Sequence, residues 1–421
     1  MPLRTIAREW GRIGCIGFGG PPAHIALLRE LCVKERGWLP ASEFEDGIAA
    51  CNLMPGPAST QLAIFCAWRL RGVAGALIGG LCFIVPGLIV ILALSTLFLA
   101  KHPPGWIRGL ADGADAAVPA VAVAAAIGLA PASWRRLVRG DDPPGPPARR
   151  SAPNAGSAST RLRRAPPRQR SWWPAELRAK RARWVGYALL GGVAAATVGP
   201  WLVLVLIACG LAEVLLTARP ARPRGPARAG RGAWLLPLAT VPATGGLLAV
   251  AWVAFKVGAL SYGGGFVIIP LMQHDAVHTY HWMTAAQFLD AVALGQVTPG
   301  PVVQTVAVVG YAAHGVGGGL LASAVAFTPS FVFVLAGARH FGRLRGNDRV
   351  QAFLTGAGPA AIGAIAGAAI PLGLALGHLW QAGLLALAAL WLIGLRRGVV
   401  SGIAGAAALG VLAFLAGAPV G

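Results

Sequence analysis

Long apolar stretches, broken by glycine and proline, recur along the whole chain. Two of them are VAGALIGGLCFIVPGLIVILALSTLFLA (Val73 to Ala100) and GIAGAAALGVLAFLAGA (Gly402 to Ala418). About 20 apolar residues allow a helix to cross the hydrocarbon of a bilayer, so the pattern predicts an all-α polytopic membrane protein. At that span length we expect about ten to thirteen membrane segments, several of them re-entrant.

The composition favours the same class, because 56% of the 421 residues are apolar and only 12% are charged. A soluble domain normally has about a quarter charged residues. Abundant glycine, alanine and proline suit close helix packing in lipid and broken helices. The six cysteines include no C-x-x-C pair, so we expect small buried residues instead of a disulfide framework or metal site.

Much of the net charge of +21 lies in two segments, Ser133 to Arg183 and Ala218 to Ala233. Both are rich in arginine, proline, glycine and alanine, which is typical of flexible linkers without a core. We interpret them as positive-inside topology signals that also contact anionic lipid. Binding of a partner is the alternative.

The two ends of the chain carry related sequences. RIGCIGFGG (Arg12 to Gly20) aligns with KVGALSYGG (Lys256 to Gly264) at an offset of 244 residues, and the same offset superimposes two P-G-P triplets. After a one-residue gap, Gln61 aligns with Gln304. The sequence therefore predicts a tandem duplication, with repeats at about residues 1–131 and 245–373.

Loop charges predict how the repeats are oriented. The loop near Lys101 has no arginine, whereas its counterpart, Ala338 to Arg349, is rich in arginine. One helix later the bias reverses, because the first repeat runs into the basic linker and the second into Pro371 to Trp380, which has no Lys or Arg. Corresponding loops therefore lie on opposite sides of the membrane. This inverted-topology repeat of two homologous helical halves is the architecture in which many secondary transporters place a site near the midplane.

These features divide the chain into six parts. We predict an N-terminal transporter repeat (1–131), an Arg/Pro-rich cytoplasmic linker (132–183), a helical hairpin (184–217), a basic linker (218–233), a C-terminal transporter repeat (234–373) and C-terminal helices (374–421).

Each P-G-P triplet separates a short helical run from a second helix. Proline suits the first helical position and glycine frees the backbone, so each triplet predicts a helix break followed by a new N-terminus. Such a terminus favours an anion, and two opposed termini would bind an oxyanion. A proline kink without a ligand is the alternative. The predicted binding residues are Pro55, Gly56, Pro57, Ser59, Thr60, Gln61, Pro299, Gly300, Pro301, Gln304 and Thr305.

The glycine runs GFGGPPA and SYGGGFVIIP add Gly19, Gly20, Gly263 and Gly264 to the predicted site, because glycine allows unwound backbone and close approach of a ligand. Helix packing on small residues is the alternative. Neither run is followed by Lys-Ser/Thr, which excludes a nucleotide phosphate loop.

Charged residues are also paired between the repeats. Arg12 and Lys256 are equivalent, and an intramembrane cation indicates attraction of an anion unless the side chain snorkels from a helix end. Asp46 and Asp290 are equivalent too, and either neutralise these cations, carry a proton during transport or cap a helix.

The three histidines His274, His278 and His281 have no counterparts in the first repeat. No cysteine or acidic ligand set completes a coordination sphere around them, so we predict no metal and no cofactor.

The segments GCIGFGGPPAHIALL, WLPASEFEDGIAACNLMPGPASTQLA and LSYGGGFVIIPLM closely resemble the chromate ion transporter family in its long two-domain form. The resemblance covers both repeats. It implies efflux of chromate, with sulphate as a related substrate, across the bacterial inner membrane, which lowers cytoplasmic chromate and gives resistance. Two features depart from the family pattern: the second glycine run lacks the immediate proline, and the linker between the halves is unusually long and Arg-rich.

We therefore expect a secondary transporter and not an enzyme, with chromate or sulphate and the lipid bilayer as partners, no nucleic acid, and a homodimer left open. In alternating access, an anion bound between the two halves would be exposed to the two sides of the membrane in turn. One alternative is a sulphate or other oxyanion transporter without a resistance role, and another is a membrane scaffold that presents its basic linker. A membrane-embedded chromate reductase is disfavoured, because the chain has no C-x-x-C, haem or flavin fingerprint.

Overall fold

The computed structural model describes residues 1–52, 54, 56–100, 102–139, 173–197, 201–217, 245–261, 266–337 and 347–420. All regular elements in these ranges are helices. The first half contains α1 (Leu3–Ile16), α2 (Pro21–Arg29), η1 (Glu30–Glu35), α3 (Ala41–Cys51), α4 (Ala58–Phe98), α5 (Gly105–Arg139), α6 (Trp173–Thr197) and α7 (Leu202–Thr217). The second contains α8 (Leu247–Leu260), η3 (Phe266–Ile268), α9 (Ile269–Gln273), η4 (His274–Thr279), α10 (Ala285–Val297), η5 (Val302–Gln304), α11 (Thr305–Gly337), α13 (Asp348–Leu374), α14 (Leu379–Ala389), η7 (Leu390–Gly394) and α15 (Val399–Leu415).

The prediction of an all-α polytopic membrane protein is confirmed. Within the described residues, four helical segments are long and apolar enough to cross a bilayer: Ala58–Phe98, Gly105–Pro131, Val302–Gly337 and Asp348–Leu374. Large apolar side chains on α4 are exposed at every fourth position, which forms one continuous stripe along the helix. They are Val73, Leu77, Leu81, Val85 and Ile89. Such a stripe suits contact with lipid tails.

The predicted duplication is visible in the positions of the helices. Helices α1 and α8 cover equivalent residues at the offset of 244, and so do η1 and η4. Helix α4 turns sharply at Arg71 and Gly72, and α11 turns in the same way at His314 and Gly315. Gly72 has φ 59° and Gly315 has φ 60°, a region that favours glycine. The same local sequence has therefore produced the same local fold twice.

The equivalent helices α4 and α11 run antiparallel, as the contacts between their longer arms show. Near one end Leu92 packs against Gly319, and near the other Gly80 packs against Phe331. Residue numbers thus rise along one helix as they fall along the other. Helices α5 and α13 are related in the same way, because Ser133 at the end of α5 lies beside Gly358 near the start of α13. Equivalent helices in opposite directions are what an inverted-topology repeat requires.

Several elements are too short to cross a membrane. Helices α1 and α8 have 14 residues each, α3 has 11 and α10 has 13. At a rise of about 1.5 Å per residue they extend about 16 to 21 Å, against about 30 Å of hydrocarbon. The broken or re-entrant helices expected from the prolines and glycines are therefore present.

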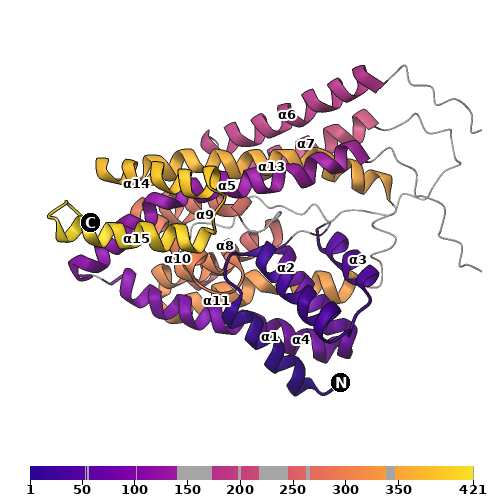
Figure 1. Ribbon diagram of the computed structural model, residues 1–421, viewed down its shortest axis with the longest axis horizontal. Helices are drawn as coiled ribbons and strands as arrows, with labels where there is room; N and C mark the ends of the chain where they lie inside the picture. Colours follow the sequence, from indigo (N-terminus) through magenta and orange to yellow (C-terminus); the bar gives the residue numbers. More distant parts are fainter. Residues whose placement is uncertain are drawn as a thin grey trace, which may run out of the picture.

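The helices form two layers (Figure 1). One layer contains α1 to α4 and α8 to α11, with α4 packed on α1 and α11, and α11 packed on α8. The other contains α5, α6, α7, α13, α14 and α15. Helix α10 packs against α5 and is the main contact between the layers. Each layer takes helices from both repeats, so the boundary between layers is not the boundary between halves.

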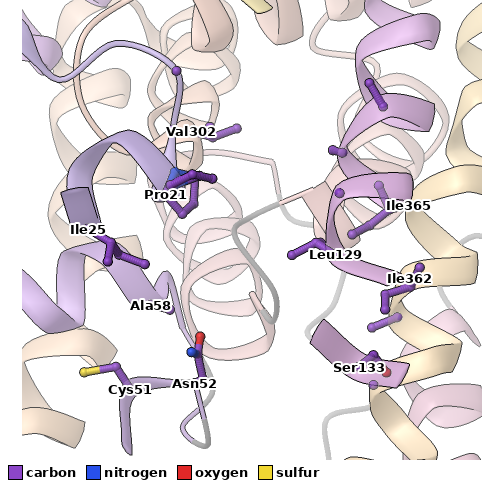
Figure 2. A pocket seen from close by; sticks show the side chains of 18 of the residues that line it. Pro21, Ile25, Cys51, Asn52, Ala58, Leu129, Ser133, Val302, Ile362 and Ile365 are labelled. Carbon is purple, nitrogen blue, oxygen red and sulfur yellow. The ribbon is translucent and has the colours of Figure 1, made fainter. Parts of the chain in front are cut away.

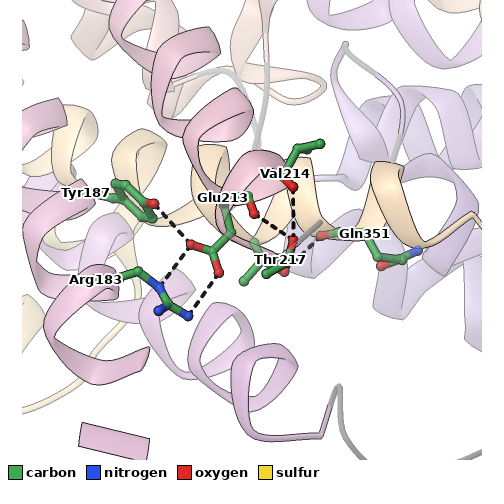
Figure 3. Close-up of polar contacts among 7 residues, drawn as sticks. Arg183, Tyr187, Glu213, Val214, Thr217 and Gln351 are labelled. Atoms are coloured by element: carbon green, nitrogen blue, oxygen red, sulfur yellow. Dashed lines mark hydrogen bonds and ion pairs between the residues drawn. The ribbon is translucent and has the colours of Figure 1, made fainter. Parts of the chain in front are cut away.

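Each helical hairpin packs on the last long helix of the other half. Helices α6 and α7 pack on α13, and α14 and α15 pack on α5. In the α6–α7 hairpin the buried carboxylate of Glu213 forms an ion pair with Arg183, Nε to Oε2 3.1 Å, and accepts a hydrogen bond of 3.0 Å from the Tyr187 hydroxyl (Figure 3). A buried carboxylate needs such partners, so these contacts hold α6 and α7 together.

Candidate functional site

The first P-G-P turn connects α3 to α4. Gly56 has φ 118°, and Pro57 precedes the first residue of α4 without a side-chain cap. The predicted residues Ser59, Thr60 and Gln61 occupy the first turn of α4 and are fully buried. The first turn of a helix leaves backbone N–H groups without intrahelical acceptors, so α4 begins with spare donors inside the protein.

The second turn repeats this geometry between α10 and η5. Gly300 has φ 104°, and Pro301 precedes η5, which leads into α11 at Thr305. The Thr305 hydroxyl donates to the Val302 carbonyl at 2.8 Å, which stabilises the start of α11. The expectation of two helix breaks, each followed by a new helix, agrees with the geometry at both positions.

The two turns are held by reciprocal hydrogen bonds between the halves. The Gly56 N–H donates to the Ser261 carbonyl at 2.5 Å, and the Gly300 N–H donates to the Gly17 carbonyl at 3.0 Å. Gly17 and Ser261 are equivalent residues that end α1 and α8. Each P-G-P turn is therefore anchored on the broken helix of the opposite repeat, which brings the two turns together.

The two predicted glutamines fold back over these turns. A β-carbon on Gly300 would lie 3.2 Å from Gln304 Oε1, and one on Gly56 would meet the Gln61 amide and, at 3.2 Å, the Ser330 hydroxyl. Gln304 also donates from Nε2 to the Ile84 carbonyl of α4 at 2.6 Å. Both amides thus lie beside the opposed turns, and Ser330 joins them although the sequence did not single it out.

Several buried polar atoms around the turns have no hydrogen-bond partner among the described residues. They are Thr60 Oγ1, Ser261 Oγ, Gln296 Nε2, Gln304 Oε1 and Ser330 Oγ. An unsatisfied buried polar group costs about 1 to 3 kcal/mol. A cluster of such unsatisfied polar atoms is expected where a polar ligand or water completes the hydrogen bonds.

His24 is a site residue that the sequence reasoning missed. It is fully buried on α2, with Nε2 2.9 Å from the Gly17 carbonyl oxygen and Nδ1 3.2 Å from Ser59 Oγ. Its ring packs edge-on against Phe83 of α4. The available signal was a histidine immediately after the G-G-P-P motif in an otherwise apolar helix.

A cavity of about 540 Å³ opens between the two layers beside the first P-G-P turn. Pro21, Ile25 and Asn52 line one side, and Leu129 and Ile362 line the other (Figure 2). Its wall also includes the predicted residues Gly19, Gly20 and Gly56. The positive φ of Gly19 (93°) and Gly20 (72°) explains why glycine is required where the chain leaves α1.

The lining of the cavity is mostly apolar, with Asn52, Ser133, Gln296 and Thr355 as its polar side chains. Its volume is that of a small-molecule pocket. Sequence reasoning did not identify Asn52 or Gln296, because nothing in the local pattern shows that α3, α5, α10 and α13 meet here.

The predicted cations form ion pairs within their own halves. Arg12 is 3.4 Å from the buried Glu9 carboxylate, and Lys256 Nζ is 2.5 Å from the buried carboxylate of Asp275. Arg12 is half exposed, whereas the Lys256 side chain is 15% exposed. Both predicted cations are therefore paired with carboxylates, and the predicted role in anion attraction would rest on a long-range field.

The equivalent aspartates differ in environment. Asp46 is exposed on α3, whereas Asp290 on α10 has a buried Oδ1 for which the described part of the chain offers no hydrogen-bond partner. Asp290 is close enough to the buried Asp115 of α5 for their charges to interact, and Asp115 Oδ1 also has no partner among the described residues. The carboxyl groups of Asp290, Asp115 and Asp112 therefore lie close enough to interact where α10 meets α5, and the sequence did not reveal Asp115.

Some predicted residues lie outside the described part of the chain. They are Pro55, Gly263 and Gly264, together with most of the Arg/Pro-rich linker and the whole basic linker 218–233.

Comparison with known proteins identifies relatives over nearly the whole chain. The family model for chromate transporters matches residues 4–214 and 248–415. A chromate transport protein of Cupriavidus metallidurans is 29% identical over 88% of this chain and 82% of its own length. A probable chromate transport protein of Synechococcus elongatus is 28% identical over 93% of this chain and 91% of its own length. A chromate transport protein of Pseudomonas aeruginosa is 27% identical over 86% and 79%. No solved structure matches the chain.

Proposed function

Because the chain belongs to the chromate transporter family, we propose that it exports chromate from the cytoplasm as a secondary transporter and thereby confers chromate resistance. Sulphate, which has the same tetrahedral shape and charge, is the proposed second substrate. The observation that supports this most is the pair of P-G-P turns, each of which is hydrogen-bonded to the opposite repeat and surrounded by buried polar atoms that have no partner among the described residues.

The proposed binding mode uses hydrogen bonds instead of a cage of cations. A chromate dianion only accepts hydrogen bonds, and the site offers the N–H groups of the first turn of α4 together with the hydroxyls of Thr60, Ser261 and Ser330. The amides of Gln61 and Gln304 would orient the anion. Neutral donors keep affinity moderate, which suits a site that must release its ligand.

Alternating access would follow from the two layers. The cavity reaches the first P-G-P turn from between the layers. A rocking motion of one layer against the other would close this cavity and, by the inverted symmetry of the repeats, open an equivalent path to the second turn. Asp290 lies at the contact of α10 with α5 and is proposed to respond to this motion.

The membrane potential would favour export of the anion. An inside-negative potential favours exit by about 2.3 kcal/mol per charge per 100 mV, which is about 4.6 kcal/mol for a dianion. The fields of Arg12 and Lys256 would assist entry of the anion. We place the protein in the bacterial inner membrane with its basic segments in the cytoplasm.

The test is uptake of radiolabelled chromate into inverted vesicles, with unlabelled sulphate as competitor. We expect Gln61→Ala and Gln304→Ala to lower the flux at least about tenfold, because a hydrogen bond to a charged group contributes about 1.5 to 3 kcal/mol. Gln287→Ala is the matched control, since Gln287 caps the start of α10 through Thr284 and does not line the site. Wild-type flux in both site variants would refute the binding site, and absence of uptake by the wild type would refute the function.

A further inference from the structure

His24 connects the two P-G-P turns through hydrogen bonds. Its Nδ1 lies 3.2 Å from the hydroxyl of Ser59 in the first turn of α4. Its Nε2 lies 2.9 Å from the Gly17 carbonyl oxygen, and the same oxygen accepts the Gly300 N–H of the second turn at 3.0 Å. A continuous path therefore runs from Ser59 through the imidazole to Gly300.

The chemistry of these partners fixes the tautomer of the neutral ring. A carbonyl oxygen only accepts, so Nε2 carries the proton and donates to Gly17. Nδ1 is then an acceptor, and the Ser59 hydroxyl must donate to it. In this state the hydroxyl proton of Ser59 points at His24 and cannot be given to an anion.

A second proton on the ring reverses the bond to Ser59. Protonated Nδ1 becomes a donor, so Ser59 Oγ accepts from it and the hydroxyl hydrogen is released to point elsewhere. Ser59 lies at the start of α4, beside Thr60, where the proposed anion would receive that hydrogen. The imidazolium would also place a positive charge close to the proposed anion.

We propose that His24 is a proton-binding site that couples uptake of one proton from water to binding of the oxyanion, with Ser59 as the group that responds. This rests on the proposed function. No covalent step is involved, because the proton binds to Nδ1 and returns to water when the anion leaves. Pro21 and Ile25, the neighbours of His24 on α2, line the cavity and place the ring near a route for water.

Several charged groups on the elements packed against α2 form ion pairs with one another. Helix α2 packs against α1, η1 and α4. The charged side chains and thiols of those elements are Arg4, Arg8, Glu9, Arg12 and Cys15 on α1, Glu30, Cys32, Lys34 and Glu35 on η1, and Cys66, Arg69, Arg71 and Cys82 on α4. Glu9 pairs with Arg12, and Glu30 pairs with Lys34. The contacts of His24 within the described residues are with a carbonyl, a hydroxyl and the Phe83 ring.

The second repeat has no equivalent of this site. The residue that corresponds to His24 at the offset of 244 is Ile268, which cannot bind a proton. The coupling therefore involves the first P-G-P turn alone, and one proton is expected for each anion.

The test is chromate binding to the purified full-length protein, measured by calorimetry across a pH range that extends well below the usual histidine pKa of about 6.5, because burial lowers the pKa of His24. We expect the ratio of wild-type to His24→Gln affinity to fall as pH rises, approaching tenfold per pH unit above the titration of His24, as linkage of one proton requires. Protonation of chromate itself affects both proteins equally and cancels in the ratio. His102→Gln, at an exposed position between α4 and α5, should follow the wild type.

Three outcomes overturn the proposal. A ratio that is constant with pH would mean that His24 has only a structural role, even when His24→Gln binds more weakly at every pH. Ser59→Ala retains the imidazole but removes the hydroxyl, so its pH slope should fall below that of the wild type, and an unchanged slope would also refute the relay. A wild-type protein that binds no chromate at any pH would overturn the proposed function and this inference with it.

Discussion

Replacement of Gly87 by alanine tests whether the position of the second P-G-P turn controls transport. Gly87 lies on α4 against the Pro299 carbonyl, and a β-carbon there would also be 2.6 Å from Gln304 Oε1. Optimal separation of non-bonded heavy atoms is about 3.5 Å, and the Pro299 oxygen would be closer still than Gln304 Oε1, so the turn or the helix must move by more than about 1 Å. Overpacking of this kind costs about 1 to 3 kcal/mol.

The displacement should affect transport more than stability. A binding site generally needs its groups within about 0.5 Å of their productive positions. We therefore expect Gly87→Ala to fold, to unfold at a lower temperature and to lose most of its chromate flux in inverted vesicles. Thermal unfolding in detergent measures the first effect, and uptake of labelled chromate measures the second.

Gly317→Ala is the matched control, because a β-carbon at Gly317 of α11 meets no atom within 4 Å. Alanine is a better helix former than glycine by about 1 kcal/mol, so this variant should be slightly more stable and transport normally. Wild-type flux in Gly87→Ala would show that the P-G-P turn can move without consequence, and the reasoning about the site would then be wrong.

Three further variants test other parts of the structure. Arg183→Met leaves the buried Glu213 carboxylate without its ion pair and should destabilise the protein by about 3 kcal/mol, measured as a lower unfolding temperature. An unchanged unfolding temperature would contradict the role of this ion pair in stabilising the α6–α7 hairpin. Asp290→Asn removes a carboxyl group whose ionisation is opposed by burial and by neighbouring carboxylates, so its thermal stability should fall less with rising pH than that of the wild type. Parallel pH profiles would contradict an ionisable group in that buried environment. In Gly315→Ala the new β-carbon meets no neighbouring atom, but the alanine must adopt φ 60°. The resulting strain of about 1 to 3 kcal/mol should lower the unfolding temperature. An unfolding temperature equal to that of the wild type would refute the need for glycine at that turn.

The sequence alone was sufficient for the features that depend on local chemistry and internal repetition. Apolar length predicted helices that cross a membrane, because backbone groups in lipid must be satisfied within the segment. Prolines beside Gly56 and Gly300 predicted helix breaks, since proline lacks an N–H and glycine accepts positive φ. The offset of 244 residues predicted the duplication, and loop charges predicted the antiparallel halves that the contacts between α4 and α11 display.

Only the tertiary structure decided which groups meet. The Gly56 N–H bonds to the Ser261 carbonyl more than two hundred residues away, and nothing in either segment specifies that partner. For the same reason His24, Ser330 and Asp115 were not recognised, because each gains its role from side chains on other helices. Lys256 likewise pairs with Asp275, whose equivalent in the first repeat is a leucine. Local sequence sets where a helix begins and breaks, whereas packing between distant segments determines which buried polar groups find partners and which are left for a ligand.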